Sequence, residues 1–291
     1  MRKYTPIGPW ITLSEMWYTT SMLVTVDTGG TKTLIASFKR NGTIADTLTF
    51  PTPKNSDDYV ATLRRILQER YGSEQVDMVV VALPGIVKDG IALWCNNLGW
   101  KNFDAQTAFS RVLGDTPIRF ENDANLAGLS EARAIEPTPV SALYVTISTG
   151  IGTGVITNGT IDPGLRHSEG GRALVEFDGI VREWESFASG KAIHTTYGKY
   201  ARDITDVRVW RQVADRISRG FLAVIPLMQP EVIIIGGSMG TYFSQYGPQL
   251  TALLREKLPA HIACPAIIQA TNPEQAVIYG AYYYAVDALA A

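Results

Sequence analysis

DTGGTKT, residues 27–33, joins two β-branched runs at 22–26 and 33–38 that the residue pattern predicts to be strands. Asn41-Gly42 then predicts a type I′ turn into a third strand at 43–50. Glycine has no Cβ, so a turn of this kind lets several backbone N–H groups converge on one anion. The segment is therefore a candidate phosphate-binding loop. If it were the one such turn in the chain, a tight hairpin that binds no ligand would be the alternative interpretation.

A second glycine-rich stretch, STGIGTG (148–154), also lies between two apolar runs, and Asn158-Gly159 follows as a second type I′ signal. Segments 23–44 and 143–161 share the order strand, glycine turn, strand, Asn-Gly-Thr-Ile. We interpret this repeat as an internal duplication, and a chance likeness of two hairpins is the alternative. Two equivalent turns facing each other across a cleft would grip the phosphates of one donor from opposite sides.

The composition indicates a protein that binds small molecules. The 291 residues include 26 basic and 28 acidic residues, so the formal net charge of -2 predicts neither a nucleic-acid nor a membrane partner. Cys95 and Cys264 lie far apart and outside any CxxC pair, which predicts no zinc site and no disulfide framework and suits the cytoplasm. No apolar run approaches the roughly 20 residues of a membrane helix.

The residue pattern predicts an α/β fold with two domains. We expect an extension at 1–21, an N-terminal α/β domain at 22–126 completed by the C-terminal helix 276–291, and a C-terminal α/β domain at 127–275. The extension is interpreted as a loose segment or a misassigned start, with an ordered arm as the alternative. Further strands are expected at 76–83, 118–121, 143–148, 155–157 and 232–235, and helices at 56–71, 105–113, 124–134 and 213–228.

ENDAN, residues 121–125, lies where a predicted strand gives way to a helix. Phosphoryl transfer needs positioned charge and one group to orient and deprotonate the attacking hydroxyl, so Asp123 is the candidate base and a helix N-cap is its alternative role. Asp27, at a strand end, is the candidate ligand of hydrated Mg²⁺, with a turn cap as the alternative. Walker A and Rossmann loops are excluded, because both glycine turns join strands and neither opens a helix.

Polar residues elsewhere are candidates for binding a polyol. Carboxylates accept hydrogen bonds strongly, which favours Glu169 and Glu185, and the amide of Asn122 offers both a donor and an acceptor. Asn96 and Asn97 belong to the same group. Exposed loop polarity is the alternative for each of these residues.

These motifs, in this order, resemble those of the ROK family of sugar kinases, within the actin-like ATPase-fold superfamily. DTGGTKT resembles the first phosphate motif, NLGW (97–100) the sugar loop, ENDAN the catalytic aspartate motif, STGIGTG the second phosphate motif and VIIIGGS (232–238) the adenosine motif. The resemblance implies two actin-like ATPase (ribonuclease H-like) domains. Their interdomain cleft would hold ATP and Mg²⁺ beside a hexose or an N-acylhexosamine.

The resemblance also implies roles for single residues. Asp123 matches the general base, Asn97 and Asn122 match sugar contacts, and Glu169 and Glu185 match sugar-binding glutamates. The residues expected at the donor are Gly29, Gly30, Thr31, Lys32, Thr149, Gly150, Gly152, Gly236 and Gly237.

The chain departs from the family pattern at the sugar site. Arg172 stands where the family has a histidine, and the cysteines that bind structural zinc with that histidine are absent between residues 177 and 184. Zinc is therefore not expected. Arg172 brings a fixed charge and five donors to the substrate, so it is a candidate substrate-binding residue.

We expect a glucokinase-like, ATP-dependent kinase that acts on a sugar hydroxyl, with polyphosphate as the alternative donor. A non-catalytic or weakly catalytic sugar sensor of the same family is the alternative function. A sugar-responsive repressor is disfavoured, since the 21 residues before the first strand are too few for a helix-turn-helix module. The resemblance also leaves a homodimer open.

Overall fold

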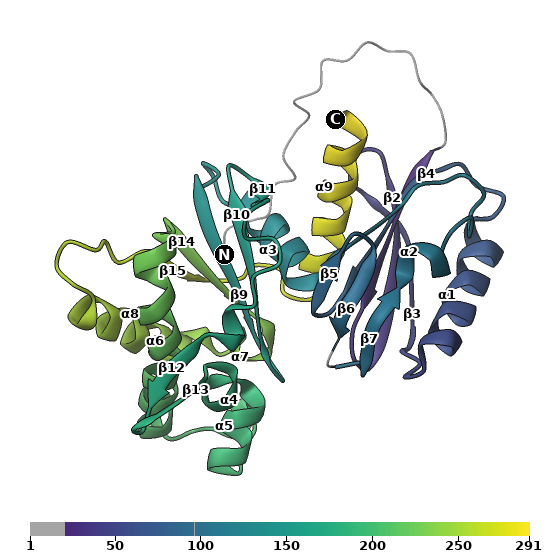
Figure 1. Cartoon of the computed structure of the whole chain (residues 1–291). Coiled ribbons are helices and arrows are strands. Elements are labelled where there is room, and N and C mark those ends of the chain that lie inside the picture. The colour runs from purple at the N-terminus through teal and green to yellow at the C-terminus, as the bar shows by residue number, and fades with distance from the viewer. Residues whose placement is uncertain (1–20, 96) are drawn as a thin grey trace.

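The computed structural model describes residues 21–95 and 97–291. The predicted extension, except for Ser21, and the candidate Asn96 lie outside the described residues. Two five-stranded sheets form the body of the molecule, and helices cover their faces (Figure 1). Among the described helices, none combines the length and the apolar composition needed to cross a bilayer.

The first sheet has the order β3-β2-β1-β4-β8. Its strands β1, β2 and β3 form an antiparallel meander, and β4 and β8 continue the sheet in parallel with β1. β4 is buried along most of its length because its run of valines meets side chains on both faces. The strands are β1 (Met22–Thr28), β2 (Lys32–Lys39), β3 (Ile44–Pro51), β4 (Val76–Leu83) and β8 (Ile118–Asn122).

The second sheet has the order β11-β10-β9-β14-β15, which matches the first strand for strand. It too opens with an antiparallel meander and adds two parallel strands. The predicted duplication is therefore confirmed at the level of topology. The strands are β9 (Ser141–Ile147), β10 (Ile151–Thr157), β11 (Thr160–Ile161), β14 (Val232–Gly236) and β15 (Ala266–Gln269).

The two Asn-Gly turns differ from each other. Asn158 and Gly159 have φ of 52° and 70°, as a type I′ turn requires. In the first sheet only Gly42 has a positive φ, 80°, and its N–H donates to the Lys39 carbonyl at 3.0 Å. The prediction of a type I′ turn at Asn41 is wrong, because the connection at 40–43 has its left-handed residue at Gly42 alone, whereas a type I′ turn needs a positive φ at both central residues.

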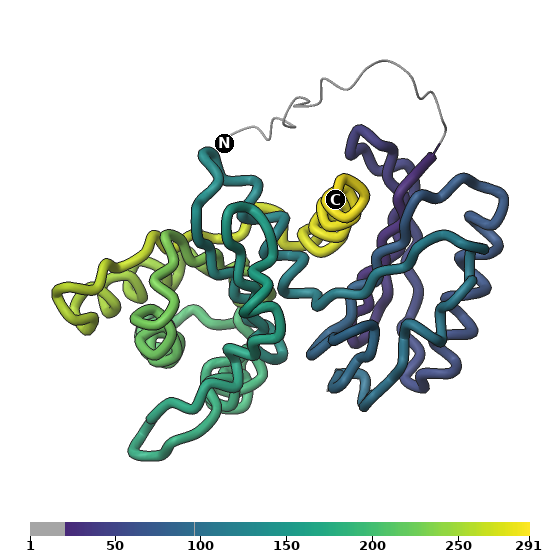
Figure 2. The backbone as a smooth tube through the Cα atoms, turned by 45° about the horizontal axis from the view of Figure 1, so that its top comes forward, coloured from purple at the N-terminus to yellow at the C-terminus, as the bar shows by residue number. Residues whose placement is uncertain are grey.

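Two central helices lie between the sheets (Figures 1 and 2). α3 (Asp123–Arg133) packs on β9 and β10, whereas α9 (Ala276–Ala290) packs on β1 and β4 of the first sheet. The helices cross closely at Gly280, where an added Cβ would lie 1.8 Å from the Leu126 carbonyl oxygen. The predicted boundary at residue 126 falls inside α3.

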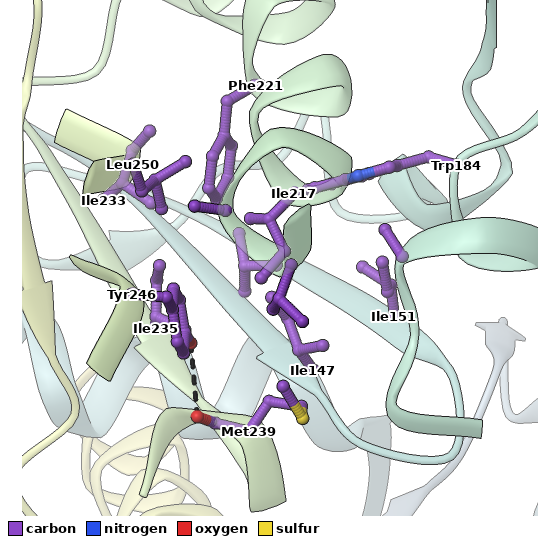
Figure 3. Close-up of a cluster of buried hydrophobic side chains, with 14 of the residues drawn as sticks. Ile147, Ile151, Trp184, Ile217, Phe221, Ile233, Ile235, Met239, Tyr246 and Leu250 are labelled. Atoms are coloured by element: carbon purple, nitrogen blue, oxygen red, sulfur yellow. Dashed lines mark hydrogen bonds between the residues drawn. The ribbon is translucent and has the colours of Figure 1, made fainter. Parts of the chain in front are cut away.

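The other helices cover the outer faces of the sheets. α1 packs on the first sheet through Tyr59, Leu63 and Leu67. The second sheet is covered by the long α6 and by α8, and Figure 3 shows Phe221 and Leu250 from these helices packed with Ile233 and Ile235 of β14. The helices are α1 (Ser56–Tyr71), α2 (Ala105–Ala108), α4 (Glu185–Ala188), α5 (Gly190–Tyr197), α6 (Val207–Met228), α7 (Gly237–Gly240) and α8 (Phe243–Lys257).

Several predicted boundaries need correction. The helix expected at 105–113 ends at Ala108, and the helix expected from residue 213 begins at Val207. β10 begins at Ile151, so Gly152 and Gly154 are strand residues and do not belong to the link. The sequence reading also missed α8 and two small antiparallel sheets. These consist of β5 (Ile86–Lys88), β6 (Ile91–Cys95) and β7 (Trp100–Asp104), and of β12 (Leu174–Phe177) and β13 (Ile180–Glu183).

Candidate active site

A cavity of about 230 Å³ lies where the two halves of the chain meet. The first half contributes the end of β4, the small sheet β5-β6-β7 and the start of α3. The second half contributes the β9–β10 turn, the loop before β12 and the starts of α4 and α5. Of the predicted site residues, the cavity is lined by Asn97, Asn122, Asp123, Thr149, Gly150, Gly152, Glu169, Arg172 and Glu185.

Asp123 is the first residue of α3 and lies in the cavity wall. The helix N-cap is Asn122, whose Oδ1 accepts from the Asn125 N–H at 3.0 Å, so the alternative role considered for Asp123 belongs to its neighbour. Asp123 Oδ1 accepts from the Ala124 N–H at 2.8 Å. Burial raises the pKa of Asp123 to about 6, which is well matched to a group that accepts a proton near neutral pH.

Asn122 is less free than the sequence indicates. Its Nδ2 donates to the Gly85 carbonyl at 2.8 Å, while its Oδ1 caps α3. These bonds hold the start of α3 against the end of β4. A sugar contact from Asn122 would use the remaining amide proton or oxygen lone pair.

Asp27 lies near the end of β1, beside the start of α3. Burial, followed by the nearby negative charge of Asp123, raises the pKa of Asp27 to about 7, and the charge of Lys32 opposes this rise. Two neighbouring carboxylates with few other charges suit a hydrated Mg²⁺ ion, which keeps most of its waters. Among residues 21–95 and 97–291, no group of three or more His, Cys, Asp or Glu side chains has the arrangement of a metal site.

Glu169, Arg172 and Glu185 line the cavity from the second half of the chain. Arg172 Nη2 lies 3.3 Å from Glu185 Oε1, and its Nη1 donates to Glu183 Oε2 at 2.6 Å. Burial and the charge of Asp123 raise the pKa of Glu169 to about 7, and Arg172 opposes this rise. Glu169 is therefore a group that can hold a proton near neutral pH.

Arg172 also bridges the two halves of the chain. Its guanidinium carbon lies 4.6 Å from the centre of the Trp94 ring, and Trp94 belongs to β6 of the first half. A cation over an aromatic face is attracted by the ring quadrupole. Arg172 thus joins the predicted sugar-binding glutamates to the opposite wall of the cavity.

Hydroxyl groups hold the first glycine turn. The Gly29 N–H donates to the Lys32 carbonyl at 3.0 Å, and Thr52 Oγ1 donates to the Gly29 carbonyl at 2.8 Å. Behind the turn, the hydroxyls of Thr28 and Tyr59 share a buried hydrogen bond of 2.7 Å. An added Cβ at Gly30 would lie 3.5 Å from the Cβ of Asn97, so this turn borders the predicted sugar loop.

The second glycine turn is held by the core and by a carboxylate. Ile147 and Ile151, on either side of it, are buried with Met239 (Figure 3). The Ile151 N–H donates to Glu185 Oε2 at 2.8 Å, and an added Cβ at Gly150 would lie 2.3 Å from that oxygen. The second glycine turn and the predicted sugar-binding glutamate are therefore in direct contact.

A second cavity of about 420 Å³ adjoins the first and shares Ser148, Thr149 and Lys191 with it. The rings of His194 and Tyr200 stack at 4.1 Å in its wall. The predicted adenosine motif reaches this cavity through Ser238.

Some predicted donor residues line neither cavity. Gly236 and Gly237 let β14 approach β9, since an added Cβ at Gly236 would lie 2.2 Å from the Tyr144 hydroxyl. The others are Gly29, Gly30, Thr31 and Lys32 of the first turn, and the predicted Mg²⁺ ligand Asp27, beside that turn, also lines neither cavity.

Three residues in or near the site were not predicted from the sequence. Trp94 and Lys191 line the cavity but belong to no motif that was considered. Arg166 was also missed; its Nε donates to the buried Glu121 carboxylate at 2.7 Å and its Nη2 donates to the Tyr284 hydroxyl at 2.7 Å. This network joins ENDAN, the loop that carries Glu169, and α9. A single charged residue in a loop gives no periodic signal that could have revealed it.

Residues 23–288 match the family model described as ROK family. The chain is 28% identical over 292 residues to an N-acetylmannosamine kinase of Haemophilus influenzae, covering 91% of this chain and 95% of the relative. It is 27% identical to a kanosamine kinase of Amycolatopsis mediterranei, covering 79% and 85%. A solved structure of an inorganic polyphosphate/ATP-glucomannokinase from Arthrobacter sp. strain KM superposes with a TM-score of 0.68 at 26% identity, covering 92% of this chain and 100% of that chain.

Proposed function

The chain belongs to the ROK family, and we propose that it transfers a phosphoryl group from ATP to a hydroxyl group of a hexose or an N-acylhexosamine. It is a sugar kinase with the actin-like ATPase fold. Relatives that act on N-acetylmannosamine and kanosamine support this substrate class. The observation that carries the proposal is the place of Asp123 in a cavity that also holds the second glycine turn and two glutamates.

Asp123 acts as the general base. Its raised pKa leaves the carboxylate ionised at neutral pH, yet close enough to the solution pH to take a proton from a hydroxyl as that hydroxyl attacks. The hydroxyl oxygen, for which we favour O6, forms a bond to the γ-phosphorus. The bond from that phosphorus to the β,γ-bridging oxygen breaks, ADP leaves with the bonding electron pair, and Asp123 keeps the proton.

The glycine turns stabilise the charge of the transferred group. Ser148, Thr149 and Gly150 of the second turn lie in the cavity wall, so their hydroxyls and backbone N–H groups are available to the phosphates. In this proposal the first turn adds its backbone N–H groups and the Thr31 hydroxyl. Donors that are fixed before the reaction need little reorganisation as charge develops.

Mg²⁺, when bound, would offset the negative charge of the phosphates. Asp27 would hold it through water molecules, with Asp123 nearby. This role fits the raised pKa of Asp27, because a cation would compensate two adjoining carboxylates.

Glu169, Glu185 and Asn97 bind the sugar hydroxyls in this proposal. Glu185 is fixed at both oxygens, by the Ile151 N–H and by Arg172, so its orientation is set before the sugar arrives. A prepositioned acceptor lowers the cost of ordering on binding. Arg172 and Trp94 would close over the sugar from the two halves and exclude water, which competes as an acceptor.

A substrate panel tests the proposal. The purified chain is assayed with glucose, mannose, fructose, N-acetylglucosamine and N-acetylmannosamine, each with ATP·Mg²⁺ or polyphosphate, and phosphorylated products are identified by ³¹P NMR. We expect turnover of at least one sugar with ATP. Sugar binding by calorimetry without turnover on any donor would support the sugar sensor and contradict the kinase.

A further inference from the structure

Lys191 lies on the edge shared by the two cavities, and the function proposed above does not use it. Among the described residues, it lines both cavities together with Ser148 and Thr149 of the second glycine turn. A donor whose nucleoside occupies the second cavity must pass its phosphates over this edge to reach a sugar in the first. The side chain at this position therefore meets the phosphate chain.

The fold fixes the backbone of Lys191 at that edge. The N–H of Gly190 donates to the Ser148 carbonyl at 2.7 Å, and an added Cβ at Gly190 would lie 2.7 Å from the same oxygen. Ser189 caps α5 through the Ala192 N–H at 3.2 Å, and the buried Ile193 anchors the helix in the core. The first turn of α5 is thus clamped to the second glycine turn.

The positive charge of Lys191 does not stabilise the fold. Its side chain is exposed, and among the described residues its ammonium has no ion-pair or hydrogen-bond partner. A lysine in the first turn of a helix opposes the helix dipole and so does not stabilise α5. A cation at this position would instead add to the positive N-terminal end of the helix in attracting an anion.

We infer that Lys191 is a catalytic residue that binds the phosphate chain of the donor between the two cavities. Its ammonium offsets the negative charge that builds on the bridging oxygen and on the leaving phosphate while the γ-phosphoryl group moves to the sugar. This role rests on the proposed kinase function and adds a side-chain cation to the backbone donors of the second turn.

The test separates phosphate binding from nucleoside binding. Lys191→Met, Lys191→Arg and the control Lys39→Met are compared with wild type by calorimetry with AMPPNP·Mg²⁺ and with adenosine. Lys39 is exposed at the end of β2 and lines neither cavity. For Lys191→Met we expect AMPPNP to bind about tenfold more weakly while adenosine binding is unchanged, and kcat to fall by about 10²-fold, the effect of losing one charge-stabilising donor.

The controls make the outcomes distinct. Lys191→Arg should keep most of the AMPPNP affinity, and Lys39→Met should match wild type. Wild-type AMPPNP affinity in Lys191→Met, or an equal loss of adenosine binding, would overturn the role of Lys191. A wild-type protein that phosphorylates no sugar would contradict the kinase proposal, while the calorimetric comparison would still decide whether Lys191 binds phosphate.

Discussion

The two glycine turns occupy equivalent places in two sheets of the same topology, but different contacts hold them. The first turn rests on hydroxyls, with Thr28 bonded to Tyr59 and Thr52 bonded to the Gly29 carbonyl. The second rests on buried Ile147 and Ile151 and on the carboxylate of Glu185. The two sheets thus keep the turn in the same position, whereas the contacts that support it differ. The second turn is hydrogen-bonded to the predicted sugar-binding residue Glu185, and the first turn borders the predicted sugar contact Asn97.

Asp123→Asn should have the largest effect, because it removes the proposed base at the start of α3 and leaves the residues of both turns unchanged. We expect kcat to fall by about 10³-fold, within the range for loss of a general base. Sugar and AMPPNP affinities, measured by calorimetry, should change little. Retained turnover would remove Asp123 from the mechanism, and an equal loss of affinity would show that Asn disturbs the site itself.

An alanine substitution in each turn tests whether the second turn is more tightly packed against sugar-binding residues than the first. Gly150→Ala places a Cβ 2.3 Å from Glu185 Oε2, so Glu185 must move, and kcat/KM for the sugar should fall by about 10²-fold. Gly30→Ala meets its nearest atom, the Cβ of Asn97, at 3.5 Å, an ordinary contact, and should be much milder. Steady-state kinetics of both variants provide the measurement. Equal losses would mean that the second turn has no special link to the sugar.

The pH dependence of kcat/KM tests whether Asp123 must be ionised for activity. Burial raises the pKa of Asp123 to about 6, and only the ionised form accepts a proton, so activity should fall as the pH drops through about 6. At pH 5 the rate should be at least about tenfold below its maximum, because Asp27 and Glu169, with pKa values raised to about 7, are then protonated as well. Profiles measured from pH 4.5 to 8 that show no loss of rate below pH 6 would contradict this assignment.

Stability measurements should show the smallest effects. Tyr59→Phe leaves the buried Thr28 hydroxyl without its partner and should lower the free energy of unfolding by about 1–2 kcal/mol. Ile151→Val beside the second turn should cost about 1 kcal/mol by loss of one buried methylene. Urea denaturation of both variants tests whether hydroxyls and apolar packing support the turns comparably. No change in Tyr59→Phe would show that the hydroxyl pair does not stabilise the first turn.

The repeated core was predictable from sequence because its signals are local. The strands around both turns, the helix 56–71 and the closing helix all follow from periodicity and turn residues. The small sheet β5-β6-β7 was missed because its strands are short and partly exposed, so they lack a clear alternation. α8 was missed because it contains Gly247 and Pro248, two residues that usually interrupt helices.

The candidate site was predictable only in part. Motif residues such as Asp123, Glu169 and Glu185 do meet in one cavity. The contacts that organise them join residues far apart in the chain, such as Arg172 over Trp94 and Arg166 on Glu121. Such pairs depend on the tertiary fold, and no spacing rule in one sequence reveals them.

The central claim is that both turns face one donor beside Asp123. A crystal structure with AMPPNP, Mg²⁺ and the sugar identified by the panel tests this claim most directly. The account predicts the attacked hydroxyl oxygen within about 3.2 Å of the Asp123 carboxylate, and phosphate oxygens bonded to backbone N–H groups of both turns. A hydroxyl bound away from Asp123, or a triphosphate that contacts one turn alone, would contradict it.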